Sequence, residues 1–240
     1  MIGLGTIINI LAIILGGVLG ILFGKALKKP VQDTLMMASG VCVLFLGISG
    51  AVKEILIIEQ GKLQTQGSMM MIFCFVLGSL VGEVINIEQR MEQFGSWLKV
   101  KTKSEGDTQF IDGFVTTSLT VCIGAMAVVG SIQDGIWGEY SLLTAKAVLD
   151  LVIVLIMTAS MGKGCIFSAI PVGLFQGSIT ILARVIAPLM TEQALSNLSL
   201  TGSMLIFCVG VDLIWGKKIK VANMLPTIVF AVAWAFTPFS

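Results

Sequence analysis

Eight stretches of this chain, each about 20 residues long, are almost free of charged side chains. A helix needs about 20 mostly apolar residues to cross the hydrocarbon core of a bilayer, where its backbone groups must be paired within the segment. The sequence therefore predicts an all-α fold, a polytopic transmembrane helix bundle with about eight spans in one integral membrane domain over residues 1–240. The expected spans are roughly residues 4–24, 33–53, 67–86, 111–132, 142–162, 165–187, 199–216 and 221–237.

Composition supports lipid as the surrounding medium. Only 12% of the 240 residues are charged, whereas a soluble domain has about 25%, so too few polar groups remain to coat a water-facing surface. The net charge of +1 gives no indication of a nucleic-acid partner. Histidine is absent and the five cysteines lie singly within apolar stretches. We therefore expect no cofactor, no metal site and no enzymatic activity.

The basic residues predict the orientation. Lysine and arginine accumulate on the cytoplasmic side because their translocation is disfavoured. Eleven of the 15 lie in alternate loops: Lys25, Lys28, Lys29, Arg90, Lys99, Lys101, Lys103, Lys163, Lys217, Lys218 and Lys220. We expect these loops in the cytosol, both termini outside it, and the chain in a bacterial inner membrane.

The cytoplasmic segment at about residues 87–109 is long enough to have structure of its own. Ile87, Met91, Phe94 and Leu98 recur at helical spacing. That periodicity predicts a short amphipathic helix lying at the membrane surface.

Several spans contain regularly spaced glycines or short segments that resemble one another. Gly16, Gly20 and Gly24 form a ridge that predicts close helix packing. GSMMMIFCFV at 67–76 resembles GSMLIFCVGV at 202–211, and LGGVLG at 15–20 resembles LGSLVG at 77–82. Either these are parallel internal repeats, or they are chance similarities between apolar segments.

Two charged residues lie within the fifth span. A charge near the bilayer centre costs at least about 2.5–3.5 kcal/mol, and Asp150 lies near the middle of this span. Lys146 is one helical turn earlier on the same face. In one interpretation Lys146 extends to the outer interface and Asp150 simply pairs with it. In the other, the pair forms a substrate or ion site facing a water-filled cavity.

The stretch VGSIQDGIWGEY at 129–140 is a second candidate. Its glycines bracket Ser131, Gln133 and Asp134 and allow the backbone to leave helical geometry, which would free carbonyl groups for a cation. The alternative is a turn in which Asp134 is exposed to water.

The sixth span completes the candidate set with Gln176 and Arg184. Pro171 suggests an interrupted helix, and interrupted helices in transporters point their ends at bound ions or substrates. Asn9 and Asn223 are expected to form interhelical hydrogen bonds.

The blocks CIGAMAVVGSIQDG, GEYSLLTAKAVLD, FSAIPVGLFQGSITILA and KKIKVANMLP resemble a family of bacterial multi-pass membrane proteins grouped as domain of unknown function 554. GTIINILAIILGGVLGILFGK at the beginning does so too, and the resemblance covers essentially the whole chain. It implies an inner-membrane location and supplies no established activity. The family often has a proline where Ala125 stands here, so a proline-induced kink in the fourth span is not expected in this chain.

Two functions are compatible with these features. The first is a transporter or channel for a small solute or cation, with its site between the fourth, fifth and sixth spans. The candidate site residues are Asp150, Lys146, Gln133, Asp134, Ser131, Gln176 and Arg184. The alternative is an envelope assembly or regulatory factor whose intramembrane polar groups are structural. In either case the lipid bilayer is a partner, and a homo-oligomer is compatible with the sequence.

Overall fold

The computed structural model describes residues 2–59 and 62–238 of the chain. Its helices and strands are α1 (Leu4–Ala26), α2 (Lys29–Ile55), β1 (Leu56–Glu59), β2 (Lys62–Thr65), α3 (Ser68–Ile85), α4 (Ile87–Lys101), α5 (Phe110–Cys122), α6 (Ala125–Trp137), α7 (Ser141–Met161), the 3₁₀ helix η1 (Lys163–Ser168), α8 (Ala169–Ile181), α9 (Ala183–Ile186), the 3₁₀ helix η2 (Ala187–Leu189), α10 (Glu192–Trp215), the 3₁₀ helix η3 (Val221–Met224) and α11 (Pro226–Trp234).

The helical membrane bundle is confirmed. Within the described residues, six helical segments are long and apolar enough to cross a membrane: α1, α2, α3, α7, η1 with α8, and α10. Counting the pair α5 and α6, which is bent by 63°, as one broken span brings the number to seven. The expected eighth span, at residues 221–237, contains a shorter apolar helix, Val221–Trp234. The loop between α2 and α3 contains an antiparallel hairpin of β1 and β2, with Leu56 opposite Thr65.

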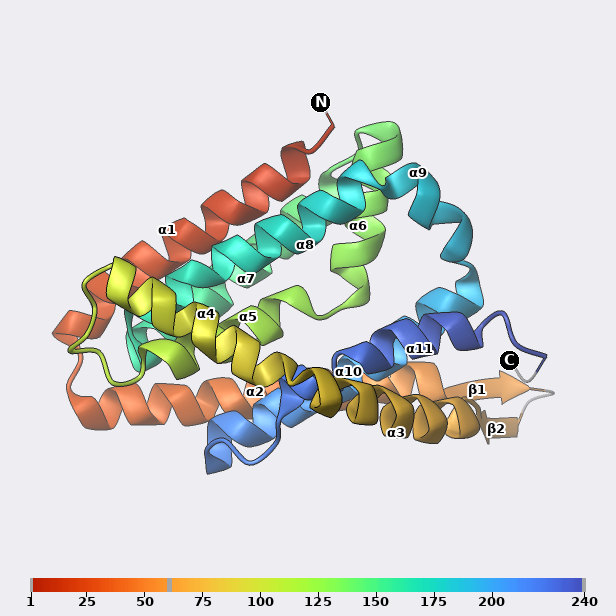
Figure 1. Ribbon diagram of the computed structural model, residues 1–240, viewed down its shortest axis with the longest axis horizontal. Coiled ribbons are helices and arrows are strands. Elements are labelled where there is room, and N and C mark those ends of the chain that lie inside the picture. Colours follow the sequence, from red (N-terminus) through yellow and green to blue (C-terminus); the bar gives the residue numbers. More distant parts are fainter. Residues whose placement is uncertain (1, 60–61, 239–240) are drawn as a thin grey trace.

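The helices form two groups (Figure 1). In one group α1 packs along α7 and α8, and α6 contacts α7 and α8. In the other, α2 packs along α10, and α3 packs against α11. α5 contacts both groups through α7, α8 and α10. Helices from distant parts of the chain therefore come together where α7 and α8 contact both α1 and α5.

The glycine ridge of α1 forms the close contact with α7. A Cβ atom at Gly20 would lie 2.6 Å from the Leu155 carbonyl oxygen, and one at Gly24 would lie 3.0 Å from that of Ala159. Because both contacts advance together along the two helices, α1 and α7 are parallel. The predicted packing role of the ridge is confirmed. The LGxxxG segment of α3 packs instead on η3 and α11, and the internal duplication stays a prediction.

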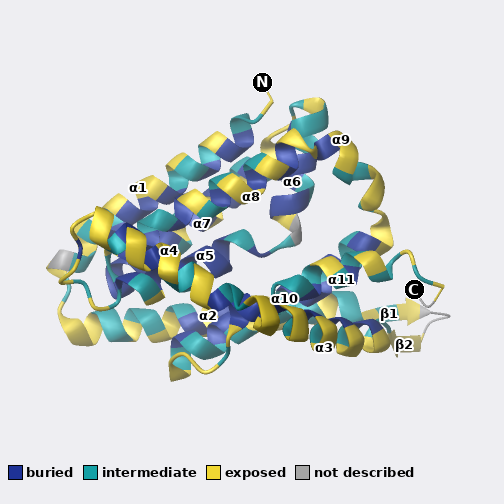
Figure 2. Cartoon of the chain, viewed as in Figure 1, coloured by how far each residue is buried: buried dark blue, intermediate teal, exposed yellow. Residues whose placement is uncertain are grey.

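Figure 2 shows that the exposed residues lie along the outer faces of the helices, including much of α3. Many of them are large and apolar, such as Phe45 on α2 and Leu80 and Val84 on α3. Apolar surface of this extent is stable against hydrocarbon rather than water.

Among the described residues, the sharp bend within a span lies at Gly124 rather than at a proline. α5 ends at Cys122, and Gly124 precedes α6 with φ 149°, a backbone conformation that favours glycine. Pro171 lies in the first turn of α8, where the missing N–H interrupts no helical hydrogen bond, and α8 continues to Ile181. The sixth span changes from η1 to α8 at Ala169 and ends its α-helix at Ile181 before α9 begins at Ala183, whereas the bend of 63° lies in the fourth span.

The helix expected in the segment after the third span is α4, and its apolar face packs on the protein. Leu98 is buried, and Ile87 and Met91 pack against the same core cluster. Glu88 is also buried, which the helical periodicity did not predict.

Candidate functional site

The Lys146–Asp150 pair is buried in the middle of α7. The side chains are 8% and 5% exposed, and Lys146 Nζ donates to Asp150 Oδ2. Lys146 therefore does not extend to a membrane interface, whereas its pairing with Asp150 is as the first interpretation expected. The chain has a second Lys–Asp pair at the same spacing, Lys29–Asp33, whose side chains are 61% and 50% exposed. The exposed pair Lys29–Asp33 can therefore serve as a control for the buried pair Lys146–Asp150.

Two amide side chains join the buried pair from neighbouring helices. Asn9 on α1 donates from Nδ2 to Asp150 Oδ2 at 3.0 Å and to Gln176 Oε1 on α8 at 3.3 Å. Both amides are fully buried. Among the described residues, Asn9 Oδ1 and Gln176 Nε2 have no hydrogen-bond partner. The predicted candidates Asp150, Lys146 and Gln176 are therefore brought together, and Asn9, expected only to link helices, belongs with them.

The broken fourth span contributes a backbone carbonyl to the same cluster. Lys146 Nζ donates to the carbonyl oxygen of Val121 at 2.7 Å. In a continuous helix this oxygen would accept the N–H four residues later, but the chain leaves the helix at Ile123. The lysine ammonium thus satisfies a carbonyl at the negative end of the α5 dipole. We call Asn9, Lys146, Asp150, Gln176 and the Val121 carbonyl the central cluster.

Asp134 lies near the beginning of α1 and caps it. Its carboxylate accepts from the backbone N–H of Gly3 at 3.1 Å and of Gly5 at 3.0 Å. Gly3 is the N-cap of α1 and has no side chain that could perform this role. Asp134 is fully buried in α6, which continues to Trp137. The expectation of an exposed turn at this position is therefore wrong.

Replacing Asp134 with leucine should lower the free energy of unfolding by about 1–2 kcal/mol, because the first N–H groups of α1 lose their cap. Thermal unfolding of detergent-solubilised protein measures this change. Glu139→Gln is the control, since Glu139 is exposed and its side chain bonds only Ser141 among the described residues. Equal melting temperatures for both variants would contradict the capping role.

The other predicted site residues are separated from the central cluster. Arg184 is exposed on α9, so it does not contribute to a buried site. Gln133 is half-buried beside Asp134 on α6, and Ser131 is fully buried one turn before Asp134. The glycines around these residues do not unwind the helix, which is continuous from Ala125 to Trp137. Gly135 instead permits close packing against Thr180 and Ala183.

Comparison with known proteins places the chain in a family. Residues 4–236 match the family described as "Protein of unknown function (DUF554)". The chain belongs to this family. It is 29% identical to the "Uncharacterized membrane protein YdfK" of Bacillus subtilis (strain 168) over 93% of this chain and 92% of that protein. It is 26% identical to the "Uncharacterized protein YqgA" of Escherichia coli (strain K12) over 95% of this chain and 94% of that protein. No solved structure matches it.

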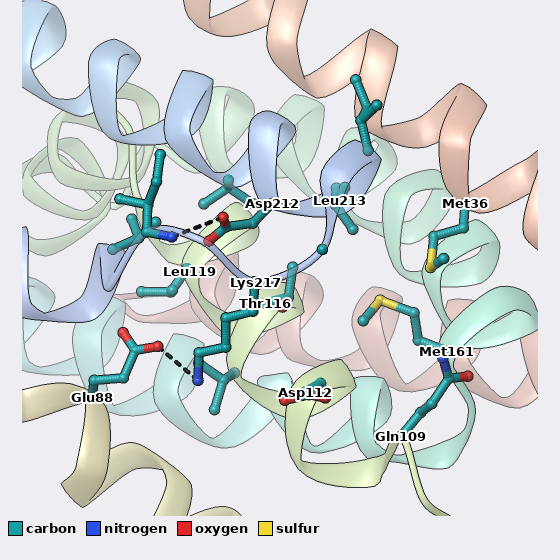
Figure 3. A pocket seen from close by; sticks show the side chains of 16 residues that line it. Met36, Glu88, Gln109, Asp112, Thr116, Leu119, Met161, Asp212, Leu213 and Lys217 are labelled. Carbon is teal, nitrogen blue, oxygen red and sulfur yellow. Dashed lines mark hydrogen bonds and ion pairs between the residues drawn. The ribbon is translucent and has the colours of Figure 1, made fainter.

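This member of the family also has a cavity at the opposite end of α7 from Ser141, which we call the polar cavity after the charged side chains that line part of it (Figure 3). It has a volume of about 200 Å³ and is lined by Gln109, Asp112, Met161, Asp212 and Lys217 among others. Little in the sequence indicates this cavity, because its residues come from α2, α4, the residue before α5, α5, α7, α10, the following loop and η3.

Ion pairs close one side of this cavity. Lys217 Nζ lies 2.8 Å from Glu88 Oε1 and also pairs with Glu92. Partial burial disfavours the charged form of Lys217, but its hydrogen bonds with Glu88 and Glu92 outweigh burial and raise its pKa above the ordinary value. The Asp212 carboxylate accepts the backbone N–H groups of Lys218 and Ile219 and fixes the loop after α10. These charged groups therefore hold the cavity wall together.

Proposed function

We propose that this chain is a transporter or channel for a small solute or ion in the bacterial inner membrane, with the central cluster as its site. The observation that carries this proposal is a buried charged pair in contact with the end of a broken helix. Intramembrane charges are costly and usually mark substrate or ion pathways. Interrupted helices supply unpaired backbone groups to such sites. The lysine distribution supports an orientation with both termini outside the cytosol.

The cluster has the chemistry to bind a polar ligand. Lys146 supplies an ammonium and Asp150 a carboxylate. The unpartnered Asn9 Oδ1 is an acceptor and Gln176 Nε2 is a donor. A ligand or water molecules carrying both donors and acceptors would satisfy these groups, whereas an apolar solute would leave them unpaired.

The test is transport by reconstituted protein. Proteoliposomes on a solid-supported membrane are exposed in turn to sodium, chloride and a mixture of small neutral amino acids, and charge movement or tracer uptake is recorded. We expect one of these probes to be carried. Asp150→Asn should reduce that flux more than about tenfold, because removing one partner of a buried charge pair costs about 2–5 kcal/mol.

Asp33→Asn is the matched control and should leave the flux unchanged, because its pair with Lys29 is exposed. A flux that Asp150→Asn does not alter would end the assignment of the site.

The second candidate is a non-transport membrane protein, such as an envelope assembly or regulatory factor. It is favoured by the close glycine packing of α1 on α7, which surrounds the central cluster with tightly fitted helices. In that case Asp150→Asn would lower stability while neither it nor the unmodified protein carried any probe.

A further inference from the structure

Polar side chains continue from the central cluster to the beginning of α1. The hydroxyl groups of Thr6 on α1 and Thr180 on α8 face each other at 3.5 Å. Thr6 lies three residues before Asn9, and Thr180 lies four residues after Gln176. Both steps lead toward Asp134, because α8 runs antiparallel to α1. We call Thr6, Thr180 and the central cluster together the polar column.

Two groups in this column lack protein partners. Asn9 Oδ1 and Gln176 Nε2 are buried, and neither has a hydrogen-bond partner in the described part of the chain. Both side chains are fully buried. Buried polar atoms in proteins are almost always hydrogen-bonded, by water where no protein group serves. Water beside Asn9 and Gln176 would satisfy both groups.

A thin apolar layer follows the cluster on its other side. Ile13, Val154 and Val172 lie four residues beyond Asn9, Asp150 and Gln176, in the direction away from Asp134. Together with Val121 and Ala169 they form one buried cluster. Since one helical turn rises about 5.4 Å, this layer is a single turn thick.

Hydroxyl groups reappear immediately after the layer. Thr117, Thr158 and Ser168 lie four residues beyond Val121, Val154 and Val172 in the same direction, and all three are buried. Ser168 Oγ is another buried atom without a partner in the described residues. Thr116, next to Thr117, lines the polar cavity of Figure 3. One apolar layer therefore separates two polar regions that lead toward opposite ends of α7.

The contents of the central cluster favour a proton over a metal cation. Lys146 Nζ occupies the position between Asp150 Oδ2 and the Val121 carbonyl oxygen, where a metal cation would otherwise be attracted. A second cation there would be repelled by the ammonium at close range. A proton can instead bind the Asp150 carboxylate directly and needs no coordination shell.

We infer that the polar column conducts protons between the Asp134 end of the protein and Asp150, and that the layer of Ile13, Val121, Val154 and Val172 is the gate that blocks their passage to the polar cavity. This inference rests on the proposed function and identifies the proton as the ion coupled to it. The proton arrives through hydrogen-bonded water and hydroxyl groups. It forms an O–H bond on Asp150, which becomes neutral, while Lys146 remains an ammonium bound to Val121. The same O–H bond breaks when water beyond the gate takes the proton.

In the described part of the chain, two titratable groups interact with Asp150. They are Lys146 on the same helix and Cys122 on α5, which is near enough to interact electrostatically with both members of the pair. α1 and α8 face the pair with the neutral side chains of Asn9 and Gln176.

The gate is tested by adding one hydroxyl group to it. Val154→Thr keeps the shape of the side chain and places a hydroxyl between Asp150 and Thr158. Protein is reconstituted into liposomes containing a pH-sensitive dye, with potassium and valinomycin to clamp the potential, and a pH step is applied. The unmodified protein should hold the pH gradient. The variant should leak protons about tenfold faster or more, the factor that one net hydrogen bond across the layer corresponds to.

Matched variants locate the path. Ile13→Thr should leak similarly, and it serves as the second gate variant if Val154→Thr does not fold. Val43→Thr makes the same change at a buried position on α2, in a different core cluster, and should not leak. Adding Gln176→Leu to Val154→Thr removes a member of the column and should suppress the leak.

Three results would overturn the inference. One is that both gate variants, folded as judged by size exclusion and melting temperature, leak no faster than Val43→Thr. Another is an equal leak of sodium, which would mean a wide pore. The third is a leak that Gln176→Leu leaves unchanged, which would place the water elsewhere. Since no transported solute is needed, these results are independent of whether any solute flux is found.

Discussion

Replacing Lys146 with methionine is expected to lower the free energy of unfolding by about 3–5 kcal/mol, because Asp150 is then a buried charge without its partner. Methionine retains most of the apolar length of lysine, so loss of the ammonium is the main change. The Val121 carbonyl loses its hydrogen bond at the same time. Unfolding of the purified protein in mixed micelles, with SDS as denaturant, measures the difference.

Two controls separate charge from packing. Lys29→Met removes the same group from the exposed pair with Asp33 and should cost less than about 1 kcal/mol. The double variant Lys146→Met, Asp150→Leu should recover most of the lost stability, because buried ion pairs can often be replaced by apolar residues without net cost. If Lys146→Met were as mild as Lys29→Met, the pair would not be buried as described.

Replacing Gly82 with alanine should destabilise the protein by about 3 kcal/mol, the upper part of the range for overpacked cores. A Cβ atom at Gly82 would overlap the carbonyl oxygen of Asn223, which is backbone and cannot rotate away. Asn223 also bonds Glu83 and the N–H of Glu88. Separating α3 from η3 would therefore disturb the junction of α3, α4 and η3 as a whole.

Gly177→Ala is the matched control, because a Cβ atom at Gly177 would meet nothing within 4 Å. Alanine is favoured over glycine in a helix by about 1 kcal/mol, so this variant should be neutral or slightly stabilised. Melting temperatures that fall for Gly82→Ala and not for Gly177→Ala would support the packing. Equal effects would contradict it.

Proximity and packing were predicted correctly for residues that lie close together in the sequence. Asp150 and Lys146 are one turn apart on one helix, so their proximity follows from helical geometry alone. Gly16, Gly20 and Gly24 share one helix face, which indicates close packing without naming the partner. Asn9 carried a weaker signal, as a polar residue within an apolar span, and its part in the central cluster was missed.

Residues whose role depends on another span were placed incorrectly or not at all. Asp134 reads as part of a glycine-rich turn, but it caps α1, which is more than 100 residues away in the chain. The break at Gly124 has little local signal, because a single glycine is compatible with a helix. It is stabilised by Lys146, which bonds the carbonyl that the break sets free.

The sequence alone determined the membrane as solvent and the approximate positions of the spans, because the transfer of apolar side chains into hydrocarbon is summed locally along the chain. It also placed a charged pair at depth. Only the tertiary structure decided that Asn9, Gln176 and the Val121 carbonyl join that pair, and that a single apolar layer separates two polar regions. Such contacts depend on which helices pack together and in what register. The fit of side chains between helices that are distant in the sequence decides both.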